Sequence, residues 1–406
     1  MAKLYNLARV STATTGTGTI TLGAAVSGFL SFSAAGVSDQ DIVRYAISDG
    51  ANSEIGYGTY TASGTTLTRN VITSTNSNSA INLSGTAQVF ITPAAQDFLV
   101  SPTAGGRLTL TSGTPVLTAT TSAATTIYYT PYVNRFVPIY NGQSFEINDF
   151  GAELSQATTD TTKSPAACTT NSNYDLFVWN DSGTYRCTRG PAWTSSTARG
   201  TGAGTSQLQM IAGIWTNQVA ITNGPAANRG TYVGTVRTNG SSQVDFVFGG
   251  SSSGGTAASI GVWNMYNRVT LNPYSADTVS SYTYQTDTLR QANSSSGNQI
   301  SFIRGMDEDA VNSIANSTFS QSIATAVASI AIGLDSTSSN SGIIAFGIGA
   351  PTASCLCPAS AIYTGYPGVG WHYLARLERS QAAGTCTWYG SVVNTLPSAI
   401  TASLRG

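Results

Sequence analysis

The stretch YDLFVWNDSGTYRCTRGPAW, Tyr174 to Trp193, decides the fold class. Its segments YDLFVW and TYRCTR each alternate side chains with a period of two residues, which is typical of β-strands. The intervening NDSG supplies Asn, Asp and Gly, which tolerate the backbone of a tight turn. The sequence therefore predicts a β-hairpin. Its apolar side chains fall on both faces, so we expect both faces to be buried, between packed sheets or against a neighbouring subunit.

The same period-two pattern extends beyond this hairpin. A second hairpin is predicted in TYVGTVRTNGSSQVDFVFGG, residues 231–250. After the Ser/Gly-rich segment 251–259, about seven further strands have the spacing of a β-sandwich or jelly roll. One helix is predicted, from Met306 to Phe319, because its acidic start suits a helix N-terminus. We therefore predict an all-β protein, with several small antiparallel β modules and a C-terminal β-sandwich or jelly-roll-like domain.

Segments rich in proline, glycine and polar residues divide the chain into four predicted domains. Residues 1–101 form an N-terminal β module that ends near SPTAGG. Residues 102–165 form a β-rich connector whose prolines confine strands to edges. Residues 166–250 carry the two hairpins, and residues 251–406 form the C-terminal β-sandwich.

Composition narrows the classes of function. Only 9% of residues are charged and 41% are hydrophobic, so solubility rests on hydroxyl and amide groups, which suits a protein buried in an assembly. The 18 basic residues form no Lys/Arg run, which argues against nucleic-acid binding. The N-terminal segment lacks the apolar run of a secretory signal, and the richest apolar stretch, Ile323 to Leu334, is too short to span a bilayer. We predict a soluble, unprocessed protein without membrane insertion.

The cysteines predict free thiols rather than disulfides or a metal site. Their odd number, in a long chain without a signal peptide, is typical of a protein made in a reducing cytosol. Cys355 and Cys357 are separated by one residue, not by the two to four of a zinc knuckle, and His372 is the sole histidine. We predict no metal and no other cofactor. The remaining cysteines are Cys168, Cys187 and Cys386.

No enzyme class is favoured by the sequence. Ser/His/Asp catalysis would have to use His372, and the Gly-x-Ser-x-Gly pattern of a nucleophile elbow is absent, so we interpret this residue as a strand position with satisfied ring nitrogens. Glycoside hydrolysis needs only two carboxylates, which 19 acidic residues can supply. The trio Asp307, Glu308 and Asp309 is interpreted as a helix cap or a solvated loop. We predict no catalytic residues and no enzyme activity.

Two regions of the sequence resemble bacteriophage virion proteins of the tail-fibre-like family. The first comprises SQATTDTTKSPAACTTNSNYDLFVWNDSGTYRCTRGPAWTSSTARGTGAG (155–204) and AITNGPAANRGTYVGTVRTNG (220–240). The second comprises SDGANSEIGYGTYTASGTTLTRNVITSTN (48–76) and INLSGTAQVFITPAAQDF (81–98), and it is similar to the virion-attachment module at the start of many such proteins. These long literal runs indicate a phage structural protein, without specifying its position on the particle.

The resemblance implies an oligomer, most often a trimer, anchored by residues 1–101 and displaying residues 251–406 to the outside. The implied partners are other copies of the chain, other tail, collar or capsid proteins, and a host surface glycan. The implied location is the virion, after assembly in the cytoplasm of the host bacterium. We interpret the protein first as a short tail fibre or spike for host attachment. The alternatives are a capsid decoration protein or a head or collar fibre, and then a polysaccharide-depolymerising tailspike.

Four aromatic residues near the C-terminus are the candidate receptor contacts. Aromatic rings stack on sugar faces, and hydroxyl and amide side chains around them bond sugar hydroxyls. Two of the candidates lie in GWHYLARL and two in TCTWYG, in predicted strands or adjoining loops. The candidates are Trp371, Tyr373, Trp388 and Tyr389. For each of them, packing in the core is the alternative interpretation.

Overall fold

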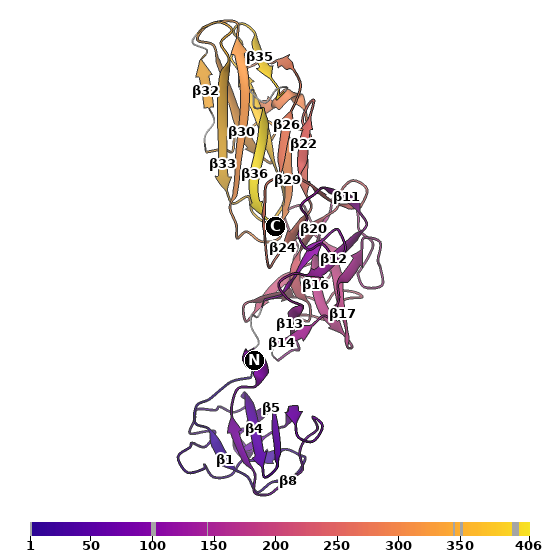
Figure 1. Cartoon of the computed structure of the whole chain (residues 1–406), viewed down its shortest axis with the longest axis vertical. Coiled ribbons are helices and arrows are strands. Elements are labelled where there is room, and N and C mark those ends of the chain that lie inside the picture. The colour runs from indigo at the N-terminus through magenta and orange to yellow at the C-terminus, as the bar shows by residue number, and fades with distance from the viewer. Residues whose placement is uncertain (1, 99–102, 144, 344–345, 350–351, 392–397) are drawn as a thin grey trace. The chain divides into compact units, whose positions relative to one another are not determined.

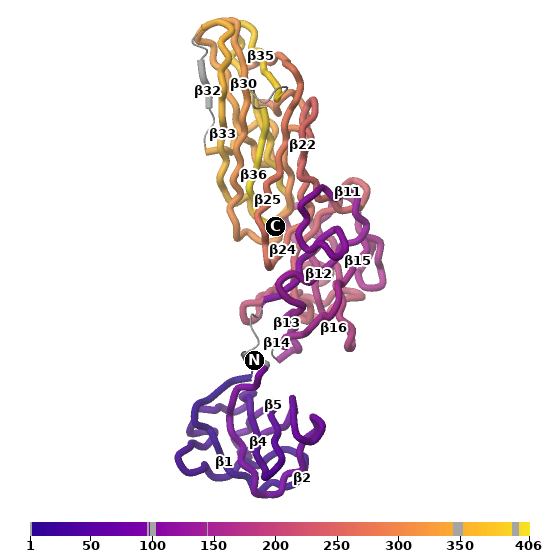
Figure 2. Tube along the Cα trace, viewed as in Figure 1, coloured from indigo at the N-terminus to yellow at the C-terminus, as the bar shows by residue number. Residues whose placement is uncertain are grey.

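The protein divides into two compact units, and almost all of its regular structure is β-strand (Figures 1 and 2). This confirms the predicted all-β fold class. The first unit contains residues 1–101 and 141–147, and the second contains residues 102–140 and 148–406. The predicted borders at 165/166 and 250/251 stay predictions. The computed structural model describes residues 2–98, 103–143, 145–343, 346–349, 352–391 and 398–406.

The first unit is an antiparallel sheet of order β1-β9-β4-β5-β6-β3, with β7 paired to β5 and a separate β2–β8 pair. Val43, Tyr45 and Ile47 alternate along β4 into its core, each at most 1% exposed. The hydroxyl of Tyr45 donates to Glu54, which also forms a buried ion pair with Arg69. The elements are β1 (Arg9–Ser11), β2 (Thr15–Gly16), β3 (Ile20–Thr21), β4 (Ile42–Asp49), β5 (Asn52–Thr61), η1 (Ala62–Gly64), β6 (Thr66–Leu67), β7 (Asn70–Ser74), β8 (Leu83–Ser84), β9 (Gln88–Ile91) and η2 (Ala95–Phe98).

The second unit begins with two small sheets. One has the order β10-β12-β15, and the other has the order β17-β16-β20-β19-β18 with β24 paired to β20. Their strands are β10 (Gly106–Thr109), β12 (Thr126–Pro131), β15 (Leu154–Ala157), β16 (Asn173–Asp181), β17 (Thr184–Ala192), β18 (Leu208–Ile211), β19 (Ile214–Asn217), β20 (Thr231–Arg237) and β24 (Val262–Asn264). Between β12 and β15 in the sequence lie β13 (Phe136–Tyr140) and β14 (Phe145–Asp149).

The hairpin predicted from residues 174–193 is confirmed as β16–β17. Its loop is Ser182-Gly183, and both residues have positive φ, at 53° and 95°, as a type I′ turn requires. The side chain of Asn180 accepts the backbone N–H of Gly183 at 2.6 Å. Leu176 and Phe177 point to opposite faces, and each is 0% exposed. One face joins the main hydrophobic core and the other joins a second cluster, so the chain itself covers both.

The rest of the second unit contains two larger sheets, which Figure 1 shows running alongside each other. The first has the order β11-β21-β23-β29-β34-β31-β32, with β28 paired to β34. Its strands are β11 (Thr121–Ala124), β21 (Val244–Val247), β23 (Ala258–Ile260), β28 (Arg290–Gln291), β29 (Gln299–Arg304), β31 (Val327–Leu334), β32 (Phe346–Gly349) and β34 (Gly370–Ser380), and η3 (Ala292–Ser294) follows β28. We call it the β34 sheet.

The second large sheet is built around β30. Its order is β22-β26-β36-β30-β35-β27, with β25 paired to β36 and β33 paired to β30. Its strands are β22 (Gly249–Ser252), β25 (Thr270–Leu271), β26 (Tyr274–Asp277), β27 (Ser281–Thr283), β30 (Val311–Gln321), β33 (Cys357–Gly365), β35 (Cys386–Tyr389) and β36 (Ala399–Arg405). We call it the β30 sheet. Both sheets contribute buried side chains to the main core, including Phe302 and Phe319.

The helix predicted from Met306 to Phe319 is wrong, because Val311–Gln321 is strand β30. Its acidic start is held by arginines instead of capping a helix. Arg268 pairs with Glu308 at 2.7 Å and with Asp309 at 2.6 Å. After these carboxylates, the side chains from Val311 onward alternate between buried and exposed, as in a strand with one covered face.

All five cysteines are free thiols in the structure. Burial raises the pKa of Cys187 and of Cys386 to about 12, and the pKa of Cys168 to about 11. Cys187 and Cys386 belong to the main core. Among the described residues, no helix has the length and apolar character needed to cross a membrane.

Candidate functional site

Two of the four predicted receptor contacts lie on β35. Trp388 is 1% exposed, packs against Phe319 with ring centres 5.2 Å apart, and donates its indole N–H to the carbonyl of Tyr284 at 3.2 Å. Tyr389 is half-buried, and its hydroxyl lies 3.0 Å from that of Ser320. A ring as buried as Trp388 presents no face to a ligand.

The other two predicted contacts lie on β34, in the other large sheet. Trp371 is half-buried beneath Arg237, whose guanidinium carbon is 5.3 Å from the ring centre. Tyr373 is half-buried as well, and its backbone N–H donates to Asp335 at 3.0 Å. The four candidates are therefore divided between two sheets.

A cavity of about 200 Å³ adjoins Trp371 and is also lined by Arg237 and Asp245. The charged groups of this cavity are engaged within the protein. Arg237 donates to Asn173 at 3.0 Å, and Asp245 accepts hydrogen bonds from Asn239 and from the backbone of Ala123. The two charged side chains of this small polar pocket are therefore engaged by neighbouring residues.

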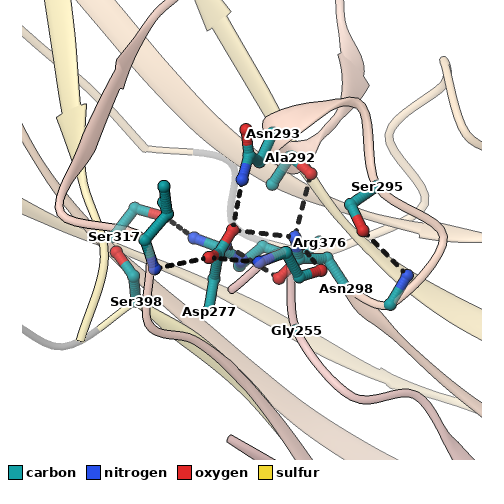
Figure 3. A network of polar contacts seen from close by, with 12 residues as sticks. Gly255, Asp277, Ala292, Asn293, Ser295, Asn298, Ser317, Arg376 and Ser398 are labelled. Atoms are coloured by element: carbon teal, nitrogen blue, oxygen red, sulfur yellow. Dashed lines mark hydrogen bonds and ion pairs between the residues drawn. The ribbon is translucent and has the colours of Figure 1, made fainter. Parts of the chain in front are cut away.

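A polar layer lies between the β34 sheet and the β30 sheet (Figure 3). Arg376, from β34, donates to Ser317 of β30 at 2.6 Å and to the side-chain oxygen of Asn298 at 2.9 Å. Its guanidinium is 3.7 Å from the carboxylate of Asp277, at the end of β26. All four side chains belong to buried residues, each at most 1% exposed. The layer connects the two sheets through charge-assisted hydrogen bonds.

Hydrogen bonds determine the protonation of the carboxylate in this layer. Burial by itself would raise the pKa of Asp277. The backbone N–H groups of Val279 and Gly254 and the side-chain amides of Asn298 and Asn293 donate to it, and together they hold its pKa below the ordinary value of 3.8. Asp277 is therefore a charged structural group enclosed by protein.

Glu378, two residues beyond Arg376 on β34, is also fully buried and joins the sheets a second time. It accepts hydrogen bonds from Arg290 at 2.9 Å and from the hydroxyl of Tyr282, on β27. Burial raises the pKa of Glu378, against the opposing effect of these donors. Enclosed carboxylates of this kind hold the two sheets together rather than facing solvent.

His372, the candidate base, is 4% exposed. One ring nitrogen, Nδ1, lies 2.7 Å from Asp335, whereas the other, Nε2, has no hydrogen-bond partner among the described residues. The interpretation that both ring nitrogens are satisfied is therefore wrong for Nε2. The ring of Phe302, 6.2 Å away between centres, lies against the imidazole. Among the described residues, no group of three or more His, Cys, Asp and Glu is arranged to hold a metal ion.

The outer face of the β30 sheet carries a groove of about 600 Å³. Strand pairing aligns its side chains in rows. In one row, Tyr274 of β26 is paired with Thr401 of β36, which is paired with Ile314 of β30, and that residue is paired with Ile362 of β33. Because these residues face away from the core, Tyr274 and Ile314 are 40% and 46% exposed.

A second row gives the groove its polar groups. Ser403, Asn312 and Thr364 are neighbours across β36, β30 and β33, and Asn272 lies beside them in the lining. The side chains of these four residues and of Thr401 make no hydrogen bond with any described residue. None of the described residues that line the groove is charged. The groove therefore offers an exposed aromatic ring, aliphatic surface, and neutral donors and acceptors that have no partner in the described part of the chain.

Sequence reasoning missed the groove because β30 was predicted as a helix. The signal that could have revealed it is the alternation in VNSIANS, which places Asn312, Ile314 and Asn316 on one face. An isolated isoleucine between two asparagines on the polar face of a strand indicates a surface with an apolar centre.

No family model matches the sequence, and no curated protein matches it. Among solved structures, the chain is similar to one from the "Structure of infectious bursal disease virus Gx strain", with 12% identity and a TM-score of 0.20. The alignment covers 67% of this chain and 63% of that chain, which is less than two thirds of its length. At this score the likeness carries no argument about fold or function.

Proposed function

We propose that the protein is a structural component of a bacteriophage virion, a short tail fibre or spike that binds a neutral glycan on the host surface. The virion role is supported by the resemblance of residues 48–76, 81–98, 155–204 and 220–240 to tail-fibre-like proteins. It is consistent with residues 1–101 falling within one compact unit that has its own hydrophobic core. The proposal involves adhesion without catalysis.

The observation that carries the adhesive role is the uncharged groove on the β30 sheet. A sugar ring presents an apolar face of C–H groups and a rim of hydroxyls, so its binding site combines an aromatic surface with neutral hydrogen-bonding groups. Tyr274 supplies the aromatic surface. Asn312, Thr401 and Ser403 supply hydroxyl and amide groups that have no partner among the described residues. The absence of charge in the described lining favours a neutral saccharide over an acidic one.

We also propose that the protein is a trimer, as the resemblance implies. The hairpin β16–β17 no longer supports it, because both of its apolar faces are covered within the chain. The other proposed partners are tail, collar or capsid proteins of the particle. Light scattering of the purified chain tests the oligomer, and a stable monomer at micromolar concentration would remove the trimer from the proposal.

Location on the particle tests the virion role. We would label virions of the phage that encodes the chain with gold-conjugated antibodies against residues 251–406. Gold at the tail is the expected result. Gold spread over the head would show that the protein is a decoration protein or head fibre and not a tail fibre. A particle without the protein, as measured by mass spectrometry, would refute the virion role.

Binding to purified host polysaccharides tests the groove. We expect Tyr274→Ala to weaken binding by the full-length protein about tenfold, because it removes the aromatic surface. Tyr366→Ala is the matched control, since Tyr366 is 64% exposed and outside the groove lining. Binding that is the same at about 0.05 M and 0.5 M salt is expected for a neutral ligand. Equal binding by Tyr274→Ala and the control would exclude the groove, and release of reducing sugar would indicate a depolymerase instead.

A further inference from the structure

The first unit has an exposed apolar surface of its own. Leu7 is 60% exposed, Leu30 is 39% exposed and Phe29 is 37% exposed. The backbone N–H of Leu30 donates to the carbonyl of Leu7 at 2.8 Å, and Phe29 precedes Leu30 in the sequence. We call these three residues, with Arg9 and Phe90, the Leu7 surface. Exposed apolar side chains on neighbouring segments are typical of a surface that contacts another molecule.

The backbone of Leu7 strengthens this interpretation. Leu7 has a φ of 61°, in the left-handed region that a bulky side chain enters at a conformational cost and that Asn or Gly enters more easily. Its carbonyl accepts a hydrogen bond from the N–H of Leu30. The next residue, Ala8, is 3% exposed and forms an isolated β-bridge with Leu30. The fold therefore holds a leucine side chain out into solvent in a conformation that disfavours leucine. Strain of this kind is characteristic of functional positions.

Arg9 adds an unpaired positive charge to this surface. Its guanidinium carbon lies 5.2 Å from the ring centres of both Phe29 and Phe90, and its Nε donates to Gln88 at 2.8 Å. The other basic residues within 1–101 pair with carboxylates: Lys3 with Asp41, Arg44 with Asp97 and Arg69 with Glu54. Arg9 forms no ion pair with any residue that the structure describes. The two aromatic rings hold its charge at the surface without neutralising it.

We propose that the Leu7 surface is where the first unit docks on the particle. The occupant is another virion protein that presents an apolar pocket with a carboxylate at its rim. Leu7, Leu30 and Phe29 would fill the pocket, and the carboxylate would pair with Arg9. Arginine is enriched at interface hot spots, and the exposed leucines add apolar area that a partner can bury. This inference rests on the virion role proposed above, and it specifies the docking residues and the chemistry of the partner.

The test uses purified full-length protein and particles assembled without it. We expect Leu7→Asn to reduce particle binding at least about tenfold, because it removes apolar area that the partner would bury. Its melting temperature should be equal to or higher than that of the wild type, because Asn tolerates the left-handed backbone. If Leu7 had a purely structural role, Leu7→Asn would lower the melting temperature and leave particle binding unchanged. Leu356→Asn is the control, since Leu356 is 50% exposed and lies in the second unit.

The charge of Arg9 is tested separately. Arg9→Glu should weaken particle binding more than Arg9→Gln, because it places a second negative charge opposite the partner's carboxylate. Undiminished binding by Leu7→Asn and Arg9→Glu would overturn the docking surface while leaving the virion role intact. If wild-type protein itself fails to bind and is absent from virions, the virion role fails and the inference fails with it. If the two variants lose self-association but still bind particles, the surface contacts a second copy of the chain, and the proposed partner is wrong.

Discussion

The hairpin β16–β17 and the strand β30 are both β-structure with two distinct faces, but only the hairpin is covered on both. Leu176 and Phe177, successive residues of β16, are each 0% exposed. On β30, Ser313 is 2% exposed whereas its neighbour Ile314 is 46% exposed. The aromatic-rich hairpin is therefore part of the protein interior, whereas β30 presents one face at the surface. The proposed binding face was found from polar groups without a partner among the described residues, and not from aromatic content.

The largest expected effect comes from the covered hairpin. Phe177→Ala should lower the free energy of unfolding by about 3–5 kcal/mol, because a fully buried ring in contact with Tyr232 is replaced by a cavity. Tryptophan fluorescence during urea denaturation measures this change in the second unit alone, since all six tryptophans lie there. A loss below about 1 kcal/mol would mean that this face is open.

A smaller loss is expected on the inner face of β30. Ser317→Ala removes an acceptor from Arg376 and should cost about 1.5–3 kcal/mol, the range for a hydrogen bond to a charged group. Ser360→Ala is the matched control on the exposed side, where the hydroxyl donates to Asn316 at 2.6 Å. Equal losses for the two variants in the same denaturation assay would contradict the contrast between the faces.

The polar layer also predicts a pH dependence. Because the pKa of Asp277 is lower in the folded protein than its ordinary value of 3.8, the carboxylate stabilises the fold above that value, and this contribution is lost as the pH falls further. We expect Asp277→Asn, although less stable overall, to lose less stability than the wild type between pH 5 and pH 3, as followed by urea denaturation at each pH. Parallel pH profiles for the two proteins would assign the acid sensitivity to other groups.

The smallest expected effect is on the outer face of β30. Ile314→Thr should change the free energy of unfolding by less than about 0.5 kcal/mol, because the side chain is half in solvent and threonine retains the β-branched shape. Its neighbour Ala315 is 0% exposed, so Ala315→Thr should cost about 1–3 kcal/mol through overpacking. The comparison would fail if Ile314→Thr proved the more damaging of the two.

The sequence predicted the hairpin well because its information is local. Alternating side chains in YDLFVW and a glycine at the turn determine the pairing without reference to the rest of the chain. The sequence did not show what covers Leu176 and Phe177, which depends on strands distant in the chain. The neighbouring subunit was therefore one of two open alternatives, and the structure favours packing within the chain.

β30 was mispredicted because the residues just before it carry a misleading local signal. Asp307, Glu308 and Asp309 resemble the first turn of a helix, but their charges are matched by arginines, among them Arg268, which lies about 40 residues earlier in the sequence. The alternation in VNSIANS indicates the exposed face of β30, but the other strands that line the groove could not be predicted from local sequence. Tyr274 and Ile314 become neighbours of Thr401 only through pairing of β26 and β30 with the last strand.

The enclosure of the cysteines has a consequence for chemical durability. A thiol whose pKa is raised to about 12, as in Cys187 and Cys386, carries almost no thiolate near neutral pH, and the thiolate is the form that oxidants and alkylating reagents attack. These two thiols are therefore protected from oxidation while the fold is closed. These two side chains would react with a thiol reagent only when the second unit opens, so the rate of their modification reports how often it does.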